Sequence, residues 1–174
     1  MDIRYPIGKF EFEGEIPAAQ REKWIAEISE FPGKLKEAVQ GLSEEQLDLP
    51  YREGGWTVRK VVHHLADSHI NSYTRFKLAL TEEKPAIKPY FEDRWANLSD
   101  ALTGDIQISI KLLEALHTRW VILLNSLNEV DFKKQFYHPE SGQSISLDYN
   151  LGFYAWHGNH HIAHITALRE RLNI

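Results

Sequence analysis

The chain has 174 residues, with 20 lysines and arginines against 25 aspartates and glutamates, giving a formal net charge of −5. Its length suits a single domain over residues 1–174, and 43% apolar and 26% charged residues are typical of a globular protein. The negative charge argues against nucleic-acid binding. The absence of cysteine excludes thiolate nucleophiles and cysteine-bound metals. No apolar run is long enough to span a membrane and the N-terminal segment lacks signal-peptide features, so we expect a cytoplasmic protein that does not bind membranes.

Four long amphipathic helices follow an extended N-terminal arm over residues 1–17. Apolar residues that recur every three or four positions predict these helices over 18–40, 57–80, 105–127 and 148–172. In the first helix, Pro32 and Gly33 predict a break or a kink. In the third, the expected buried stripe consists of Ile108, Leu112, Leu116, Trp120 and Leu123.

The connections between these helices are long. Ser43 opens a short helical turn with a capping-box pattern, residues 81–104 form a loop with a helical piece near 91–97, and residues 128–147 suggest a small hairpin from QFYH and QSISL. Four such helices predict an all-α fold, a four-helix bundle. Connections of this length predict that the chain crosses over an end of the bundle or forms the lip of a site there.

Four of the nine histidines fall within eight residues of the last helix, at positions 157, 160, 161 and 164. On a helix these side chains share one face, and the pairs His157/His161 and His160/His164 each have the i,i+4 spacing that binds one metal ion. The apolar residues of this helix centre nearer to the first pair, which favours His157 and His161 as ligands. His160 and His164 are then either neighbours that support the metal site or residues on its exposed rim.

A bundle site needs a further ligand from a second helix, and GWTVRKVVHHLADSH supplies three candidates. Periodicity places His69 deepest, with His63 and His64 flanking the apolar stripe, and does not decide among them. Asp67, one turn after His64, is a candidate for orienting that imidazole or is a solvated acid.

Packing alone is a poor reason to crowd imidazoles, because each buried ring needs partners for both of its nitrogens. Three neutral nitrogens that converge on one divalent cation would satisfy this need and leave a coordination position open, as in catalytic zinc sites. Without carboxylate ligands, zinc, nickel, iron or cobalt suits the site better than magnesium or calcium.

The segments GWTVRKVVHHLADSH and FYAWHGNHHIAHI strongly resemble the DinB/YfiT-like family of metal-binding four-helix bundles, and the resemblance covers essentially the whole chain. It is closest to the YfiT branch, described as metal-dependent hydrolases and linked to bacillithiol transferases. The resemblance implies an up-down-down-up bundle, a homodimer, bound zinc or nickel, and the ligands His64, His157 and His161. Many relatives carry Arg-Gly-Gln where this chain has Ile162-Ala163-His164, so the resemblance assigns no role to His164.

Two chemistries on a small-molecule substrate stay open. An open metal position that takes water predicts hydrolysis, whereas one that takes a thiol predicts transfer to an electrophile, with the thiol supplied by a cosubstrate such as bacillithiol. The lack of an evident general base points toward thiol transfer. A third reading is a metal-binding or stress-linked bundle without turnover, in which His160 or His164 supplies a fourth protein ligand.

Overall fold

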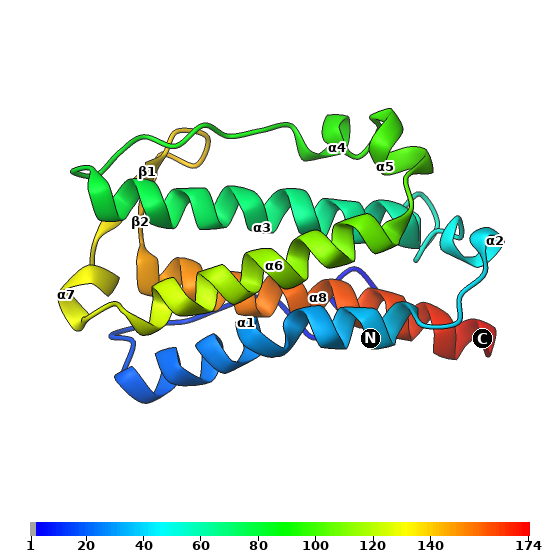
Figure 1. The fold of residues 1–174 in the computed structure, drawn as a ribbon, viewed down its shortest axis with the longest axis horizontal. Helices are drawn as coiled ribbons and strands as arrows, with labels where there is room; N and C mark the ends of the chain where they lie inside the picture. The colour runs from blue at the N-terminus through cyan, green and yellow to red at the C-terminus, as the bar shows by residue number, and fades with distance from the viewer. Residues whose placement is uncertain (1–2) are drawn as a thin grey trace.

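Four long helices lie side by side along the molecule (Figure 1). The structure is a computed structural model and describes residues 3–174; the first two residues of the predicted arm fall outside this range. In the bundle, α1 and α8 run in one direction and α3 and α6 in the other, which is the predicted up-down-down-up order. The helices are α1 (Ala18–Val39), α3 (Val58–Thr81), α6 (Ile106–Asn125) and α8 (Leu147–Leu172).

The parallel pair α3 and α6 requires the chain to travel back along the bundle between them. Residues 82–105 make this return across the top of Figure 1 and include α4 (Glu92–Trp95) and α5 (Ser99–Thr103). The predicted hairpin is present just before α8, with β1 (Gln135–His138) antiparallel to β2 (Gln143–Ser146). The short α2 (Glu44–Leu47) has the predicted capping box, while α7 (Glu129–Phe132) was not predicted.

Each long helix packs against two others. Contacts join α1 to α8 and α6, and α3 to the same two helices, so α1 and α3 occupy opposite corners of the bundle. The α3–α8 contact is therefore antiparallel, and it brings the two histidine-rich segments of the sequence together.

Pro32 lies inside α1 without ending it, so of the predicted break or kink the break is wrong. Proline has no N–H, and the carbonyl four residues earlier, that of Ile28, therefore loses its helical hydrogen bond. This carbonyl lies 2.6 Å from Nδ1 of His117, which replaces the missing donor from a neighbouring helix. The proline is tolerated because the exposed carbonyl is satisfied from outside the helix.

The buried face of α6 differs from the predicted stripe. Ile108 and Leu112 are 66% and 44% exposed, and Leu116 and Leu123 are half-buried. The buried residues of the helix, besides the predicted Trp120, are Ile106, Ser109, Ile110, Leu113, His117 and Leu124. The helix is apolar around most of its circumference, so its periodicity alone does not select the face that the other helices cover.

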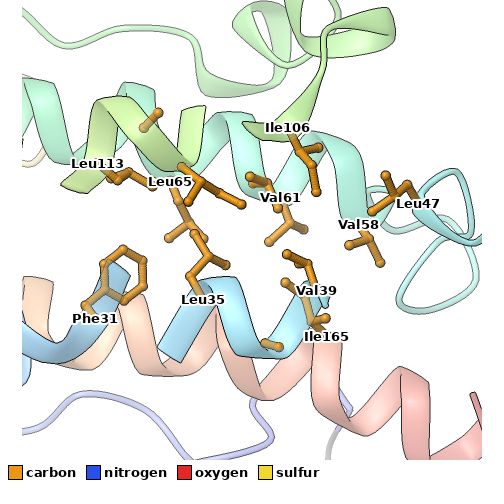
Figure 2. Close-up of a cluster of buried hydrophobic side chains, with 14 of the residues drawn as sticks. Phe31, Leu35, Val39, Leu47, Val58, Val61, Leu65, Ile106, Leu113 and Ile165 are labelled. Atoms are coloured by element: carbon orange, nitrogen blue, oxygen red, sulfur yellow. The ribbon is translucent and has the colours of Figure 1, made fainter. Parts of the chain in front are cut away.

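Two hydrophobic clusters fill the bundle. The first, which we call the aliphatic cluster, lies between α1, α3, α6 and α8 (Figure 2) and includes Leu35, Val61, Leu65, Leu113 and Ile165. The second, the aromatic cluster, is centred on Trp24, Phe76, Trp120, Phe136 and Tyr154. Among the residues that the structure describes, no helix is long and apolar enough to cross a membrane.

The N-terminal arm, residues 3–17, is held against α8 by its aromatic and main-chain groups. Nε1 of Trp156 donates a hydrogen bond to the Gly8 carbonyl at 3.2 Å, and the Phe10 ring packs against Trp24 and Phe153. The Tyr5 ring lies 5.8 Å from the ring of His160. The arm thus borders the histidine-rich face of the last helix.

Candidate metal centre

Three histidines from two helices meet inside the bundle. His64 comes from α3, and His157 and His161 come from α8, where their four-residue spacing places them on one side of the helix. One ring nitrogen of each residue lies within 4.8 Å of the others. Nε2 of His64 and Nε2 of His157 are 3.3 Å apart. All three side chains are buried.

Burial also determines the protonation of these rings. It lowers the pKa of His64 to about 4 and lowers the pKa of His157 and of His161 well below the usual value, with neighbouring histidines adding to the effect. All three imidazoles are therefore neutral at pH 7. A neutral imidazole has one nitrogen with a free lone pair, which is the form that binds a metal.

The cluster fits a transition-metal ion. In a tetrahedral zinc site with Zn–N distances of about 2.0–2.1 Å, two ligand nitrogens lie about 3.3 Å apart, which is the separation of the His64 and His157 nitrogens. Three imidazoles without a carboxylate are a donor set suited to zinc or nickel rather than to magnesium or calcium. A three-residue set also leaves room for a further ligand.

The three histidines line a cavity of about 700 Å³. The Trp56 ring lies 4.6 Å from that of His64 and is nearly parallel to that of His161, so it shields one side of the cluster. The other lining residues include both aromatic and charged side chains, among them Arg4, Arg52, Arg75, Tyr90, Glu92, Asp93 and Tyr154. A cavity of this size and mixed character suits a small organic substrate.

His160 and His164 are both buried, which excludes the exposed-rim alternative. They line the same cavity, and their rings stack on Trp156 and Tyr51 respectively. Neither belongs to the group of three converging nitrogens. Nδ1 of His160 is buried without a hydrogen-bond partner in the described part of the chain.

The structure distinguishes among the three candidate metal ligands on α3. Nδ1 of His63 lies 2.7 Å from the Ser109 hydroxyl and its Nε2 lies 3.1 Å from the Gly104 carbonyl, so this ring is held outside the cluster. His69 is fully buried, as predicted, and its Nε2 lies 3.4 Å from Nδ1 of His157. Only His64 contributes a nitrogen to the cluster.

Asp67 is half-buried on α3. Burial raises the pKa of its carboxyl group to about 6, with a further contribution from the charge of Asp100. Within residues 3–174 its carboxylate makes no hydrogen bond with His64, so a role in orienting that ring stays a prediction.

His117 was missed by the sequence analysis. It is buried on α6, and its Nε2 lies 2.8 Å from Nδ1 of His69. The available signal was its spacing of four residues after Leu113 and three before Trp120, both buried. Because the predicted stripe of α6 omitted Leu113, the sequence analysis did not identify His117 as a residue of the buried face.

Comparison with known proteins identifies close relatives. A family model described as the DinB superfamily matches residues 27–165. A Bacillus subtilis protein named "Putative metal-dependent hydrolase YfiT" is 53% identical over 99% of this chain and 97% of its own length. Relatives from Bacillus mycoides and Oceanobacillus iheyensis, also named metal-dependent hydrolases, are 55% and 56% identical, each over at least 98% of both chains.

One solved structure matches almost the whole chain. The structure of YfiT from Bacillus subtilis superposes with a TM-score of 0.97 at 53% identity, covering 99% of both chains. It is described as "a probable metal-dependent hydrolase with an unusual four-helix bundle topology". The same topology is seen here, with parallel α3 and α6 joined by a long return.

Proposed function

Because this chain belongs to the DinB superfamily, we propose that it is a metal-dependent hydrolase whose His64, His157 and His161 bind one divalent ion, zinc or nickel. The observation that carries the proposal is the convergence of three buried, neutral imidazoles at the wall of a cavity large enough for a small molecule. The names of the relatives support the same activity.

The protein's own groups would bind the ion and shape its surroundings. When bound, a divalent ion acts as a Lewis acid that lowers the pKa of water and polarises a substrate oxygen. The imidazoles supply lone pairs without competing protons at neutral pH. Trp56 limits solvent access on one side, and the arginines and tyrosines of the cavity offer hydrogen-bond donors to a polar substrate.

A pair of neighbouring substitutions tests the ligand set. His64→Asn removes a proposed ligand, whereas His63→Asn changes the adjacent residue, which contacts Ser109 outside the cluster. We expect the protein purified after zinc or nickel loading to contain one ion per chain, measured by elemental analysis. The ion should be lost from His64→Asn and kept by His63→Asn. Equal metal content in the two variants would contradict the assignment.

Turnover assays separate hydrolysis from thiol transfer. The zinc- and nickel-loaded proteins are incubated with p-nitrophenyl acetate, and in parallel with bacillithiol and monochlorobimane. Ester hydrolysis that disappears in His64→Asn supports the proposal. Conjugate formation without hydrolysis would replace it by thiol transfer, and no turnover in either assay would leave a metal-binding bundle.

A further inference from the structure

A chain of ring contacts extends from the metal centre into the core. Nδ1 of His157 lies 3.4 Å from Nε2 of His69, and Nδ1 of His69 lies 2.8 Å from Nε2 of His117. Nδ1 of His117 in turn lies 2.6 Å from the carbonyl oxygen of Ile28. Three imidazoles thus connect a proposed metal ligand to one main-chain carbonyl.

That carbonyl determines where the protons lie. A carbonyl oxygen only accepts, so Nδ1 of His117 carries a proton. Neutral His117 then accepts at Nε2 from the Nδ1–H of His69. His69 accepts at its own Nε2 from the Nδ1–H of His157. The Nε2 of His157 is left with a lone pair, and this is the atom that faces Nε2 of His64.

The opposite proton order would need a cation in the core. If His117 were doubly protonated it would donate to His69, and His157 would end with a proton on Nε2. Burial opposes this charge, because the side chains of His117 and His69 are 1% and 0% exposed and an imidazolium there would lose its hydration. The rings of both residues also pack against Phe31, an apolar neighbour that does not stabilise a buried positive charge through a hydrogen bond.

Pro32 makes the Ile28 carbonyl available. In an uninterrupted α-helix the N–H of residue 32 would bond to the carbonyl of residue 28. Proline has no N–H, so this oxygen is left to a donor from outside α1, and His117 supplies it. Pro32 is unfavourable inside a helix by its sequence alone, and the hydrogen bond from His117 explains why it is tolerated there.

A second, shorter chain reaches the other ligand of α8. Nε2 of His164 lies 3.2 Å from the Arg4 carbonyl, and its Nδ1 lies 3.4 Å from Nδ1 of His161. The same reasoning places a proton on Nε2 of His164, a lone pair on its Nδ1, and a proton on Nδ1 of His161. The Nε2 of His161 is left with its lone pair. The Tyr51 ring, stacked on His164 at 4.0 Å, restricts the orientation of that imidazole.

We infer that His69, His117 and His164 are positioning residues: their hydrogen bonds, anchored at the Ile28 and Arg4 carbonyls, hold His157 and His161 as Nδ1–H tautomers whose Nε2 lone pairs bind the metal ion. The inference rests on the proposed metal site. It assigns each of these buried histidines a role, and it makes His164 part of the site.

The first test measures tautomers in the metal-free wild-type protein. Two-bond ¹H–¹⁵N correlation spectra of histidine-labelled protein show which ring nitrogen carries each proton, with signals assigned from single variants. We expect Nδ1–H for His69, His117, His157 and His161, and Nε2–H for His164. An Nε2–H form of His157 or of His161 would overturn the inference.

The second test uses matched substitutions and zinc affinity. Glutamine at 117 offers an oxygen near the position of Nε2, whereas methionine has the same length and no strong acceptor. Asparagine at 164 offers an oxygen near the position of Nδ1, whereas leucine has the same shape without it. We expect about 10- to 100-fold weaker zinc binding in His117→Met and His164→Leu, with most of the affinity kept in His117→Gln and His164→Asn.

Competition with a chromophoric chelator gives these affinities, and circular dichroism verifies folding. Wild-type affinity in folded His117→Met and His164→Leu would refute the positioning role. Failure of the wild-type protein itself to bind zinc or nickel would instead refute the proposed function. In that case the tautomers measured in the metal-free protein still test whether the two series of histidine hydrogen bonds exist.

Discussion

The aliphatic cluster around Leu35 and Leu65 and the buried histidines around His157 fill adjacent parts of one bundle, and Phe31 contacts both. In the aliphatic cluster the side chains have no polar atoms, so stability depends on filled volume. Each imidazole, by contrast, needs a suitable partner for two nitrogens. The first region should tolerate changes that conserve volume, and the second should tolerate only changes that conserve donors and acceptors.

The largest effect is expected from removing volume in the aliphatic cluster. Leu35 is fully buried, and Leu35→Ala should lower the free energy of unfolding by about 2–5 kcal/mol, through lost burial and the cavity left behind. Urea denaturation measures this loss. Zinc affinity of the folded variant should remain that of the wild type, and a large fall in affinity would show that the two regions are not independent.

Acidification should act on the histidines and leave the aliphatic cluster unaffected. His117 has a pKa of about 4 in the folded protein against 6.5 as the ordinary value. Between these pH values the unfolded chain binds more protons, so stability falls as the pH drops from 6.5 toward 4. A shift of this size corresponds to about 3 kcal/mol. Urea denaturation of metal-free protein across this range should show the loss, and His117→Gln should reduce it; identical pH profiles would contradict the explanation.

Zinc binding should stabilise the folded protein only through the proposed histidine ligands. At a free zinc concentration 100 times the dissociation constant, the gain is about 2.7 kcal/mol for an ion that binds only the folded state. Thermal denaturation with and without zinc should show this gain in the wild type and in Leu35→Ala, and not in His161→Asn. The same gain in all three proteins would mean that zinc binds elsewhere.

The smallest effect is expected where the two regions meet. A Cβ atom at Gly158 would lie 2.6 Å from the Phe31 ring, which stacks on His69. Gly158→Ala should therefore displace that ring and cost about 1–3 kcal/mol through overpacking. Denaturation curves give the cost, and Gly33→Ala is a control because a Cβ there meets no neighbouring atom. Equal stability of the two variants would contradict the predicted clash.

Periodicity and spacing predicted the parts of this molecule that depend on local patterns. The four long helices, the capping box at Ser43 and the hairpin follow from residues close together in sequence. The pairing of His157 with His161 follows from helical geometry. The up-down-down-up order was implied by the family resemblance, since long connections alone allow several topologies.

Other features depended on packing between helices. Periodicity left His63, His64 and His69 undecided, because all three are buried and only the contact with α8 distinguishes them. On α6, Ile108 was predicted to be buried because most of the circumference of that helix is apolar. Pro32 looked like a helix breaker because its compensating hydrogen bond comes from His117, 85 positions later in the chain, a partner that local sequence does not reveal.

The N-terminal arm has a practical consequence for handling this protein. Arg4 lines the cavity and its carbonyl accepts from His164, while Gly8 is tied to Trp156. Proteolytic cleavage between Arg4 and Gly8 during purification would therefore detach part of the cavity wall and the hydrogen-bond acceptor of His164.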